Sequence, residues 1–211
     1  MKWSADLAYV VGLITTDGSL SKDGRHIDFT SKDINLIRTF AGVLKLKNKI
    51  GLKSSSYGKG KTYYRIQFGN VKFYHFLVDI GLTPNKTKTL GSLTIPKEYF
   101  IDFLRGHLDG DGYTFSYWDK RWKSSFMLYT GFISASKPHL EWIQKEIKTL
   151  WKLDGALNFS GRSTYHLMYA KKSSVALLEK VYYKDCLPCL ERKQSKIMQS
   201  MGIIRQEAQV V

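Results

Sequence analysis

The segment Val10-Val11-Gly12-Leu13-Ile14-Thr15-Thr16-Asp17-Gly18 has a second, similar copy later in the chain. That copy reads Leu104-Arg105-Gly106-His107-Leu108-Asp109-Gly110-Asp111-Gly112. Its glycine at 106 and its aspartate at 111 follow their counterparts, at 12 and 17, by the same 94 positions. A constant offset between similar segments indicates an internal duplication. We therefore divide the 211 residues into a first repeat, residues 1–97, and a second repeat, residues 98–211.

The sequence after each copy continues in parallel. Thr30-Ser31-Lys32-Asp33 and Ala135-Ser136-Lys137-Pro138 each precede an apolar pattern with the period of a helix. These two segments are 105 positions apart, so we expect about eleven extra residues in the first hairpin of the second repeat. Asp23-Gly24 is a strong signal for the turn of the first hairpin. Each repeat is predicted to fold as helix, strand, strand, helix, strand, strand, helix.

Apolar and polar side chains alternate along the later strands of both repeats. In the first repeat the alternation is between two sets, Tyr64, Ile66, Phe68 and Tyr63, Arg65, Gln67. In the second repeat the sets are Leu157, Phe159, Tyr165, Leu167 and Asn158, Ser160, Arg162, Thr164, His166. A period of two predicts a sheet with one apolar face and one polar, basic face. Such a face is suited to binding a polar ligand, although a half-exposed sheet that only faces water has the same pattern.

The charge of the chain points to a polyanionic partner. The formal net charge is +15 at pH 7, and seven basic residues but no acidic one lie between Lys45 and Arg65. Nucleic acid is the first candidate, ahead of an anionic membrane surface or an acidic protein. No stretch has the roughly 18 apolar residues of a membrane helix, and the N-terminus lacks the pattern of a signal peptide. We therefore expect a soluble, intracellular protein.

Glycine inside each motif predicts close contact between the two motif helices. Ala8 and Gly12 lie four residues apart and share one helix face, as do Gly106 and Gly110. Glycine in a helix costs about 1 kcal/mol relative to alanine, so its presence in both copies favours a specific approach of the two backbones. The apolar residues available to pack around this contact are Leu7, Val11, Ile14, Ile101, Leu104 and Leu108.

An aspartate ends each motif helix. Gly18 and Gly112 suit a left-handed position after the helix, which places Asp17 and Asp111 at the negative ends of two helix dipoles. If the helices pair side by side, the two carboxylates repel each other and favour a bound cation. Oxygen ligands select Mg²⁺, Mn²⁺ or Ca²⁺, and such a cation beside a basic sheet is suited to phosphodiester hydrolysis. Either Asp-Gly taken alone is more often an ordinary turn.

Both motifs and the pattern that follows them resemble the LAGLIDADG homing endonucleases over nearly the whole chain. The second copy is the closer match, and the first departs from the family at Thr15 and Thr16. The resemblance implies an α+β, pseudo-twofold duplicated αββαββα fold, with two antiparallel β-saddles and the motif helices at the subdomain interface. It also implies a monomeric enzyme that cuts both strands of double-stranded DNA at an asymmetric site of about 20 bp, leaving 3′ overhangs.

The resemblance further implies roles for individual residues. Asp17 and Asp111 would bind the divalent metal, together with the backbone carbonyls of Thr16 and Gly110. Mg²⁺ is expected first, Mn²⁺ is possible, and Ca²⁺ is expected to bind. The active-site lysines would be Lys86 and Lys193, with Lys88 as the alternative in the first repeat. The residues that would order water are Ser31 and Ser136, or the adjacent Lys32 and Lys137.

Residues that bind DNA are expected on the outward strand faces and on the basic loops. Arg to guanine, and Asn or Gln to adenine, are the physically favoured pairings. The full set is Arg25, His26, Asp28, Lys32, Lys53, Lys59, Lys61, Arg65, Gln67, Lys120, Arg121, Lys123, Lys137, Asn158, Arg162 and His166. Tyr117, Trp118 and Trp122, in the longer hairpin, could contact DNA or cap the edge of the sheet.

Two other functions are compatible with the same fold. One is a maturase that binds intron RNA and assists splicing, and the other is a DNA-binding regulator without catalytic activity. Retention of both Asp17 and Asp111 favours the nuclease. Cleavage of a target duplex by the pure protein with Mg²⁺ separates the nuclease from both alternatives.

Overall fold

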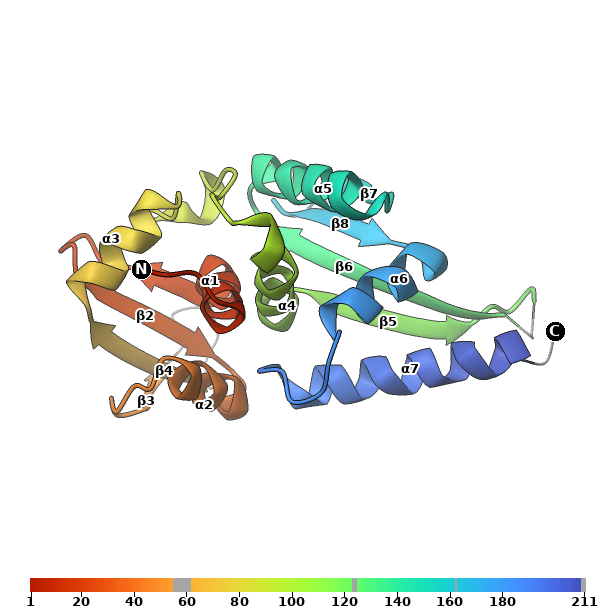
Figure 1. Cartoon of the computed structure of the whole chain (residues 1–211), viewed down its shortest axis with the longest axis horizontal. Coiled ribbons are helices and arrows are strands. Elements are labelled where there is room, and N and C mark those ends of the chain that lie inside the picture. Colours follow the sequence, from red (N-terminus) through yellow and green to blue (C-terminus); the bar gives the residue numbers. More distant parts are fainter. Residues whose placement is uncertain (55–61, 123–124, 162, 210–211) are drawn as a thin grey trace.

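The computed structural model describes residues 1–54, 62–122, 125–161 and 163–209, arranged as two similar halves side by side (Figure 1). The elements of the first half are α1 (Ala5–Asp17), β1 (Gly18–Leu20), β2 (His26–Ser31), α2 (Ile34–Val43), β3 (Gly51–Ser54), β4 (Thr62–Gly69) and α3 (Val71–Asp79). The elements of the second half are α4 (Phe100–Gly110), β5 (Tyr113–Trp118), β6 (Phe126–Ser134), α5 (Lys137–Trp151), β7 (Ala156–Phe159), β8 (Tyr165–Tyr169), α6 (Lys171–Val181) and α7 (Glu191–Gln209). Two short 3₁₀ helices, η1 (Lys86–Lys88) and η2 (Lys97–Tyr99), lie between the halves in the sequence.

Each half contains an antiparallel four-stranded sheet with the same topology. The strand orders are β1-β2-β4-β3 and β5-β6-β8-β7. This arrangement confirms the expected α+β fold with two antiparallel sheets and the predicted order of elements. Helix α7 is an addition that the predicted pattern lacks. It extends along the second sheet below β5 in Figure 1.

Local sequence signals account for the starts of the first-half helices. The side chains of Ser4, Asp33 and Asn70 cap α1, α2 and α3 by accepting hydrogen bonds from backbone N–H groups of the first turn. The first hairpin turns at Gly24, whose φ of 77° lies in the left-handed region. The Asp23 carboxylate accepts hydrogen bonds from the backbone N–H groups of Arg25 and His26 and stabilises this turn.

The second repeat is longer in its first hairpin, but by fewer residues than expected. Asp33 is the N-cap of α2 and Ser136 is the N-cap of α5, so the equivalent positions are 103 residues apart and not 105. The two Ser-Lys pairs are not at equivalent positions, because Ser31 is the last residue of β2 whereas Ser136 is the N-cap of α5. The extra length extends β5 and β6 well beyond the body of the sheet (Figure 1).

The apolar faces of the sheets pack against helices on one side, as the alternation predicts. In the first sheet Ile27, Phe29, Ile66 and Phe68 are buried, and Phe29 stacks on Phe40 of α2 at 4.3 Å between ring centroids. Phe159 is an exception, because it is 59% exposed at the end of edge strand β7. Within the described residues, no helix is long and apolar enough to cross a membrane.

Candidate active site at the helix interface

Helices α1 and α4 lie against each other at the centre of the molecule, and glycine makes their contact possible (Figure 1). A Cβ atom on Gly12 would stand 2.2 Å from the carbonyl oxygen of Phe103. A Cβ atom on Gly106 would stand 2.0 Å from the carbonyl oxygen of Tyr9. No side chain fits at either position, so the close approach expected from the duplicated glycines is present.

The glycines that follow the two helices have a different role from the one expected. Gly18 has φ −88° and ψ 155°, which is extended backbone, and Gly112 is not among the glycines with positive φ. The prediction of a left-handed position was therefore wrong, because the chain passes directly from each helix into a strand. A Cβ would lie 2.6 Å from Cα of Ile14 at Gly18, and 2.5 Å from Cα of Leu108 at Gly112, so glycine is needed for space.

The C-terminal ends of α1 and α4 meet at one pocket. Asp17, Gly110 and Asp111 line it, together with Asp109 of the same helix. The volume of the pocket is about 420 Å³, and residues of both repeats contribute to its wall. The carboxylate of Asp17 lies so near the second helix that a Cβ on Gly110 would be 3.1 Å from its Oδ2.

The two carboxylates share one electrostatic environment. Burial and the nearby charge of Asp111 together raise the pKa of Asp17 to about 7, against the opposing charges of Lys193 and Lys86. Burial also raises the pKa of Asp111, again against the two lysines. Each acid is therefore harder to ionise than a free aspartate, and a cation in the pocket would favour the ionised form of both.

Both predicted lysines reach the ends of these helices. Lys86 is buried, and its ammonium donates to the carbonyl of Gly18. Lys193, in the first turn of α7, donates to the carbonyls of Leu108 at 2.7 Å and Gly112 at 2.6 Å, and also to those of Asp109 and Gly110. Burial lowers the pKa of Lys86 to about 8. Lys88, the alternative in the first repeat, is exposed.

The oxygen ligands at this pocket fit a hard divalent cation. Two carboxylates come from different helices, and Thr16 packs against Gly110 across the interface, where a Cβ on the glycine would overlap its Oγ1. Among the described side chains there is no group of three or more His, Cys, Asp or Glu that could hold a metal. An ion would therefore need backbone carbonyls, water or a substrate phosphate as further ligands, which is the usual environment of Mg²⁺.

Helix α4 buries charged side chains in a way that the sequence did not reveal. The side chains of Arg105 and Asp102 form an ion pair of 2.8 Å inside the protein. Asp109 accepts hydrogen bonds from the Tyr9 hydroxyl at 2.9 Å and from the backbone N–H of Leu190 at 2.7 Å. Burial raises the pKa of Asp109 to about 6. Asp109 thus holds in place the start of the segment that carries Lys193, a role that a motif match alone does not suggest.

The residues expected to order water lie at the pocket in the first repeat but away from it in the second. Ser31 and Lys32 line the pocket. Ser136 is buried away from it, and its hydroxyl donates to the carbonyl of Leu90 between the repeats at 2.5 Å. Lys137 forms an ion pair with Glu141 on α5 at 3.1 Å. The expectation of equivalent roles for Ser136 and Lys137 was wrong, because the two Ser-Lys pairs are not at equivalent positions of the fold.

Most of the predicted DNA-binding residues of the first repeat share the outer face of the first sheet, opposite the helices. The strand register places His26, Asp28, Lys53, Arg65 and Gln67 there. Arg25 lies in the adjoining hairpin turn. Arg65 donates two hydrogen bonds to the carboxylate of Asp28, at 2.7 and 2.8 Å, so these two charges compensate each other in the free protein. Lys59 and Lys61 lie outside the described residues.

The predicted residues of the second repeat are more scattered. His166 and Asn158 are direct partners on the outer face of the second sheet. Lys120 and Arg121 lie at the distant end of the long hairpin, where Arg121 pairs with Asp119 at 3.0 Å. Lys123 and Arg162 lie outside the part of the chain that the structure describes.

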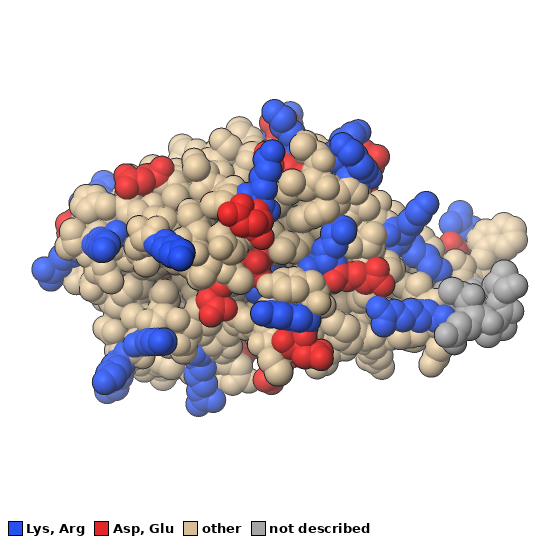
Figure 2. Space-filling view, viewed as in Figure 1, with Lys and Arg blue, Asp and Glu red and all other residues tan. Residues whose placement is uncertain are grey.

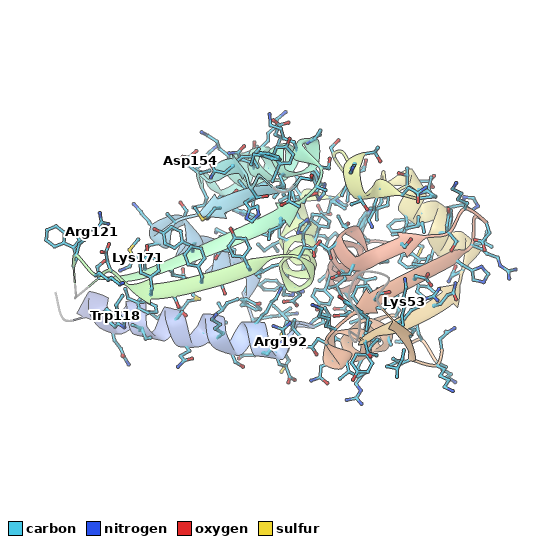
Figure 3. The ribbon with its side chains drawn as sticks, turned by 180° about the vertical axis from the view of Figure 1, so that it is seen from behind. Lys53, Trp118, Arg121, Asp154, Lys171 and Arg192 are labelled. Atoms are coloured by element: carbon cyan, nitrogen blue, oxygen red, sulfur yellow. The ribbon has the colours of Figure 1, made fainter. Side chains whose placement is uncertain are left out.

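The positive charge is not concentrated on the helix-covered side. There, Lys and Arg are interspersed with Asp and Glu (Figure 2). The opposite side, where the strands face the viewer, carries Lys53 on the first half and Arg121 at the tip of the second (Figure 3). The side seen in Figure 2 therefore has no continuous positive patch that a polyanion could bind.

Comparisons with known proteins agree with this geometry. Residues 4–81 match the family model of the LAGLIDADG-like domain. No curated protein sequence matches the chain.

Three solved structures illustrate the structural likeness. Full-length DUF199/WhiA from Thermatoga maritima aligns with 16% identity and a TM-score of 0.61 over 98% of this chain, which spans 62% of that protein. The homing endonuclease I-WcaI, bound to its DNA recognition sequence, aligns with 14% identity and a TM-score of 0.64 over 90% of this chain and 88% of its own. I-DmoI in complex with DNA and Ca aligns with 16% identity and a TM-score of 0.60 over 92% and 97%. The first repeat thus matches the model of the LAGLIDADG-like domain over residues 4–81, and the chain has the fold of the homing endonucleases over both repeats.

Proposed function

We propose that this protein is a divalent-metal-dependent endonuclease that cuts both strands of a long, asymmetric DNA site. One observation carries the proposal. Two glycine-paired helices bring Asp17 and Asp111 to a single pocket, and the ammonium groups of Lys86 and Lys193 donate to backbone carbonyls at the ends of the same two helices. With one sheet in each repeat to cover about one turn of duplex, the site would span about 20 bp. Cleavage is expected to leave 3′ overhangs, as in the family that the chain resembles.

The roles of the residues follow from their positions. Asp17 and Asp111, with the carbonyls of Thr16 and Gly110, would hold the cation, which supplies charge to activate water and to stabilise the leaving oxygen. Mg²⁺ is proposed first, and the solved structures with this fold include complexes with Mn, Mg or Ca. The ammonium groups of Lys86 and Lys193 would stabilise negative charge that develops on the phosphate. Their burial places both charges where water screens them least.

The proposal is tested by replacing one acid at a time. Asp17→Asn and Asp111→Asn should abolish double-strand cleavage of targets selected from a randomised DNA library with Mg²⁺. Both variants should bind those targets with nearly unchanged affinity. Asp154→Asn is the matched control, because Asp154 is an exposed acid that pairs with Lys148 far from the pocket. Cleavage at the wild-type rate by Asp17→Asn would exclude the proposed site.

Metal binding is measured separately from cleavage. The thermal midpoint of unfolding of the wild type should rise with added Ca²⁺ or Mg²⁺, because ligands that bind only the folded state stabilise it. Asp17→Asn and Asp111→Asn should lose this rise, whereas Asp154→Asn should retain it. Failure of the wild type to respond to any divalent cation would contradict the proposed ligand set.

A second candidate function is DNA binding without cleavage. It is favoured by Lys193, whose ammonium donates to the carbonyl of Gly110, one of the proposed metal ligands, at 3.2 Å. The likeness to DUF199/WhiA shows that the fold also occurs in proteins that are not described as endonucleases. Tight binding of a selected DNA duplex with no cleavage in Mg²⁺ or Mn²⁺ would establish this candidate in place of the first.

A further inference from the structure

The pocket at the ends of α1 and α4 is lined by basic residues as well as by acids. Lys32, which follows β2, and Arg192, in the first turn of α7, line it together with Asp17 and Asp111. Arg192 lies where the second half of the molecule meets the first (Figure 3). One of these cations comes from each repeat, and we name the two residues the basic wall of the pocket.

Neighbouring side chains hold the basic wall in place. The ammonium of Lys32 lies over the ring of Tyr63, which also lines the pocket, at 5.5 Å from the ring centroid. Nε of Arg192 donates to the carboxylate of Asp33 at 2.7 Å. Within the described part of the chain, the two terminal nitrogens of this guanidinium form no hydrogen bond. They are therefore available to a phosphate, for which the planar guanidinium is well suited.

The strand register identifies the counterpart of Lys32 in the second repeat. Ser31 ends β2 opposite a tyrosine of β4, and Ser134 ends β6 opposite a tyrosine of β8. The two serines are thus at equivalent positions. The residue that follows is Lys32 in the first repeat and Ala135 in the second, so the equivalent position has no charge.

The counterpart of Arg192 is also uncharged. Lys86 and Lys193 are equivalent, because each donates to the carbonyl of the last glycine of a motif. The residue before Lys193 is Arg192, and the residue before Lys86 is Asn85. The two acids and the two lysines therefore obey the pseudo-twofold symmetry of the fold, whereas the basic wall does not.

We propose that the basic wall binds the scissile phosphate of one DNA strand, and that the enzyme cuts this strand first. The inference rests on the proposed function and adds an order to its two cleavage events. Each event adds one water across a phosphorus–oxygen bond and leaves a phosphate monoester and an alcohol. Cations beside the phosphate stabilise the negative charge that develops during this step. The other strand meets alanine and asparagine at the equivalent positions, so its cleavage is slower and a nicked duplex is the intermediate.

Strand-resolved kinetics measure the order. The substrate is a target duplex, selected from a randomised library by binding, with a different fluorescent label on each strand. With Mg²⁺ the wild type should cut one strand about tenfold faster than the other. Lys32→Ala and Arg192→Ala should each slow the faster strand by about tenfold and change the slower strand by less than about twofold. Equal rates for the two strands of the wild type would overturn the proposal, as would equal slowing of both strands by the variants.

A matched control comes from the same helix. Arg205 of α7 pairs with Glu179, and its side chain is 65% exposed, compared with 64% for Arg192. Arg205→Ala should leave the rates of both strands unchanged. If Arg205→Ala slowed the faster strand as much as Arg192→Ala, general positive charge would explain the effect and the basic wall would not.

Moving the cation to the other repeat tests the order directly. Lys32→Ala combined with Ala135→Lys places the ammonium at the equivalent position of the second repeat. Ala135 is half-buried and is not among the residues with positive φ, so its backbone accepts a lysine. The double variant should cut the second strand first. Circular dichroism establishes whether it is folded, and an unchanged order in the folded protein would contradict the assignment.

Binding without metal separates this inference from the proposed function. Each central phosphate of the target is replaced in turn by an uncharged methylphosphonate, and the Kd is measured in EDTA by fluorescence anisotropy. One replacement, in the strand that is cut faster, should weaken binding of the wild type by about fivefold but should not affect Arg192→Ala. If Mg²⁺ supports cleavage of neither strand, the proposed function fails, and this measurement still decides whether the basic wall binds one strand. Equal losses for the wild type and Arg192→Ala at every position would overturn the inference.

Discussion

The two motif helices hold equivalent places in the two repeats but bury different side chains. Helix α1 buries apolar residues on both sides of Gly12, whereas α4 buries charged and polar residues around Gly106. The equivalent pairs, 94 positions apart, are Ala8 and Asp102, Val11 and Arg105, Leu13 and His107, and Thr15 and Asp109. A duplicated scaffold therefore needs identical residues only where backbones touch. At the other positions the two helices stabilise the interface with different side chains.

The largest expected effect concerns the buried ion pair of α4. Asp102→Ala should lower the free energy of unfolding by about 3–5 kcal/mol, because it leaves the guanidinium of Arg105 buried without its carboxylate. Adding Arg105→Met to give α4 the apolar character of α1 should recover a large part of that loss. Chemical denaturation of the single and double variants measures both values. A double variant less stable than Asp102→Ala would show that the charges in α4 are not interchangeable with the apolar residues of α1.

The glycine contact is the feature that both helices share. Gly106→Ala should lower the free energy of unfolding by about 3 kcal/mol, because its Cβ would meet the carbonyl oxygen of Tyr9 and separate the helices. Gly42→Ala is the control, since nothing lies within 4 Å of a Cβ at that exposed position of α2. It should stabilise the protein by about 0.5–1 kcal/mol. Equal effects of the two substitutions in urea denaturation would be inconsistent with a close helix contact.

The stacked histidines of the second repeat predict a pH response that the first repeat lacks. His107 and His139 are buried with their Nε2 atoms 3.2 Å apart. Burial lowers the pKa of His139 to about 4 and that of His107 well below its usual value. The unfolded chain binds protons at these positions below about pH 6.5 and the folded protein does not, so stability should fall as the pH decreases from about 6.5 towards 4.

The variant His139→Asn isolates this effect. It retains a donor toward the carbonyl of Gly91, which the Nδ1 atom of His139 contacts at 2.9 Å. Between pH 6 and pH 5 the wild type should lose on the order of 1 kcal/mol more than the variant. Asp17 and Asp109 act in the opposite direction, because their raised pKa values favour the folded state at low pH, and they are common to both proteins. Identical slopes would show that the histidine pair does not control acid stability.

The smallest loss of stability is expected for an ion pair that joins the two repeats at the protein surface. Arg192 of α7 donates to the Asp33 carboxylate of the first repeat at 2.7 Å, but its side chain is largely exposed. Arg192→Ala should cost less than about 1 kcal/mol and the cost should decrease with salt. A loss as large as that of Asp102→Ala would mean that the repeats depend on this contact more than on the helix interface.

The sequence predicts the order of the elements because hydrophobic period and turn signals are local. The glycines at 12 and 106 also predict the helix contact, since glycine in a helix is costly unless the space is used. The alternation in β4 correctly predicts which side chains of the first sheet are buried. The order of the elements and the burial in β4 depend on patterns within a few residues of one another, whereas the helix contact depends on a motif that recurs 94 positions later.

The features that the sequence does not reveal depend on distant parts of the chain. Arg105 is buried because Asp102 and the carbonyl of Pro188 surround it, and no local pattern reports that carbonyl. Helix α7 has no counterpart in the first repeat, so the duplication could not predict it. Ser31 and Ser136 were matched wrongly because the same residue type ends a strand in one repeat and caps a helix in the other.

The segment that joins the repeats has a consequence for how the protein could evolve. The carbonyls of Leu90 and Gly91 form hydrogen bonds with the side chains of Ser136 and His139 at the start of α5. These bonds hold the joining segment against the second half of the same molecule. Encounter of the halves is then intramolecular, and the shared pocket exists at any dilution of the protein. A pair of identical subunits must change both copies of a surface at once. Here each sheet is free to acquire its own ligand preference without altering the other.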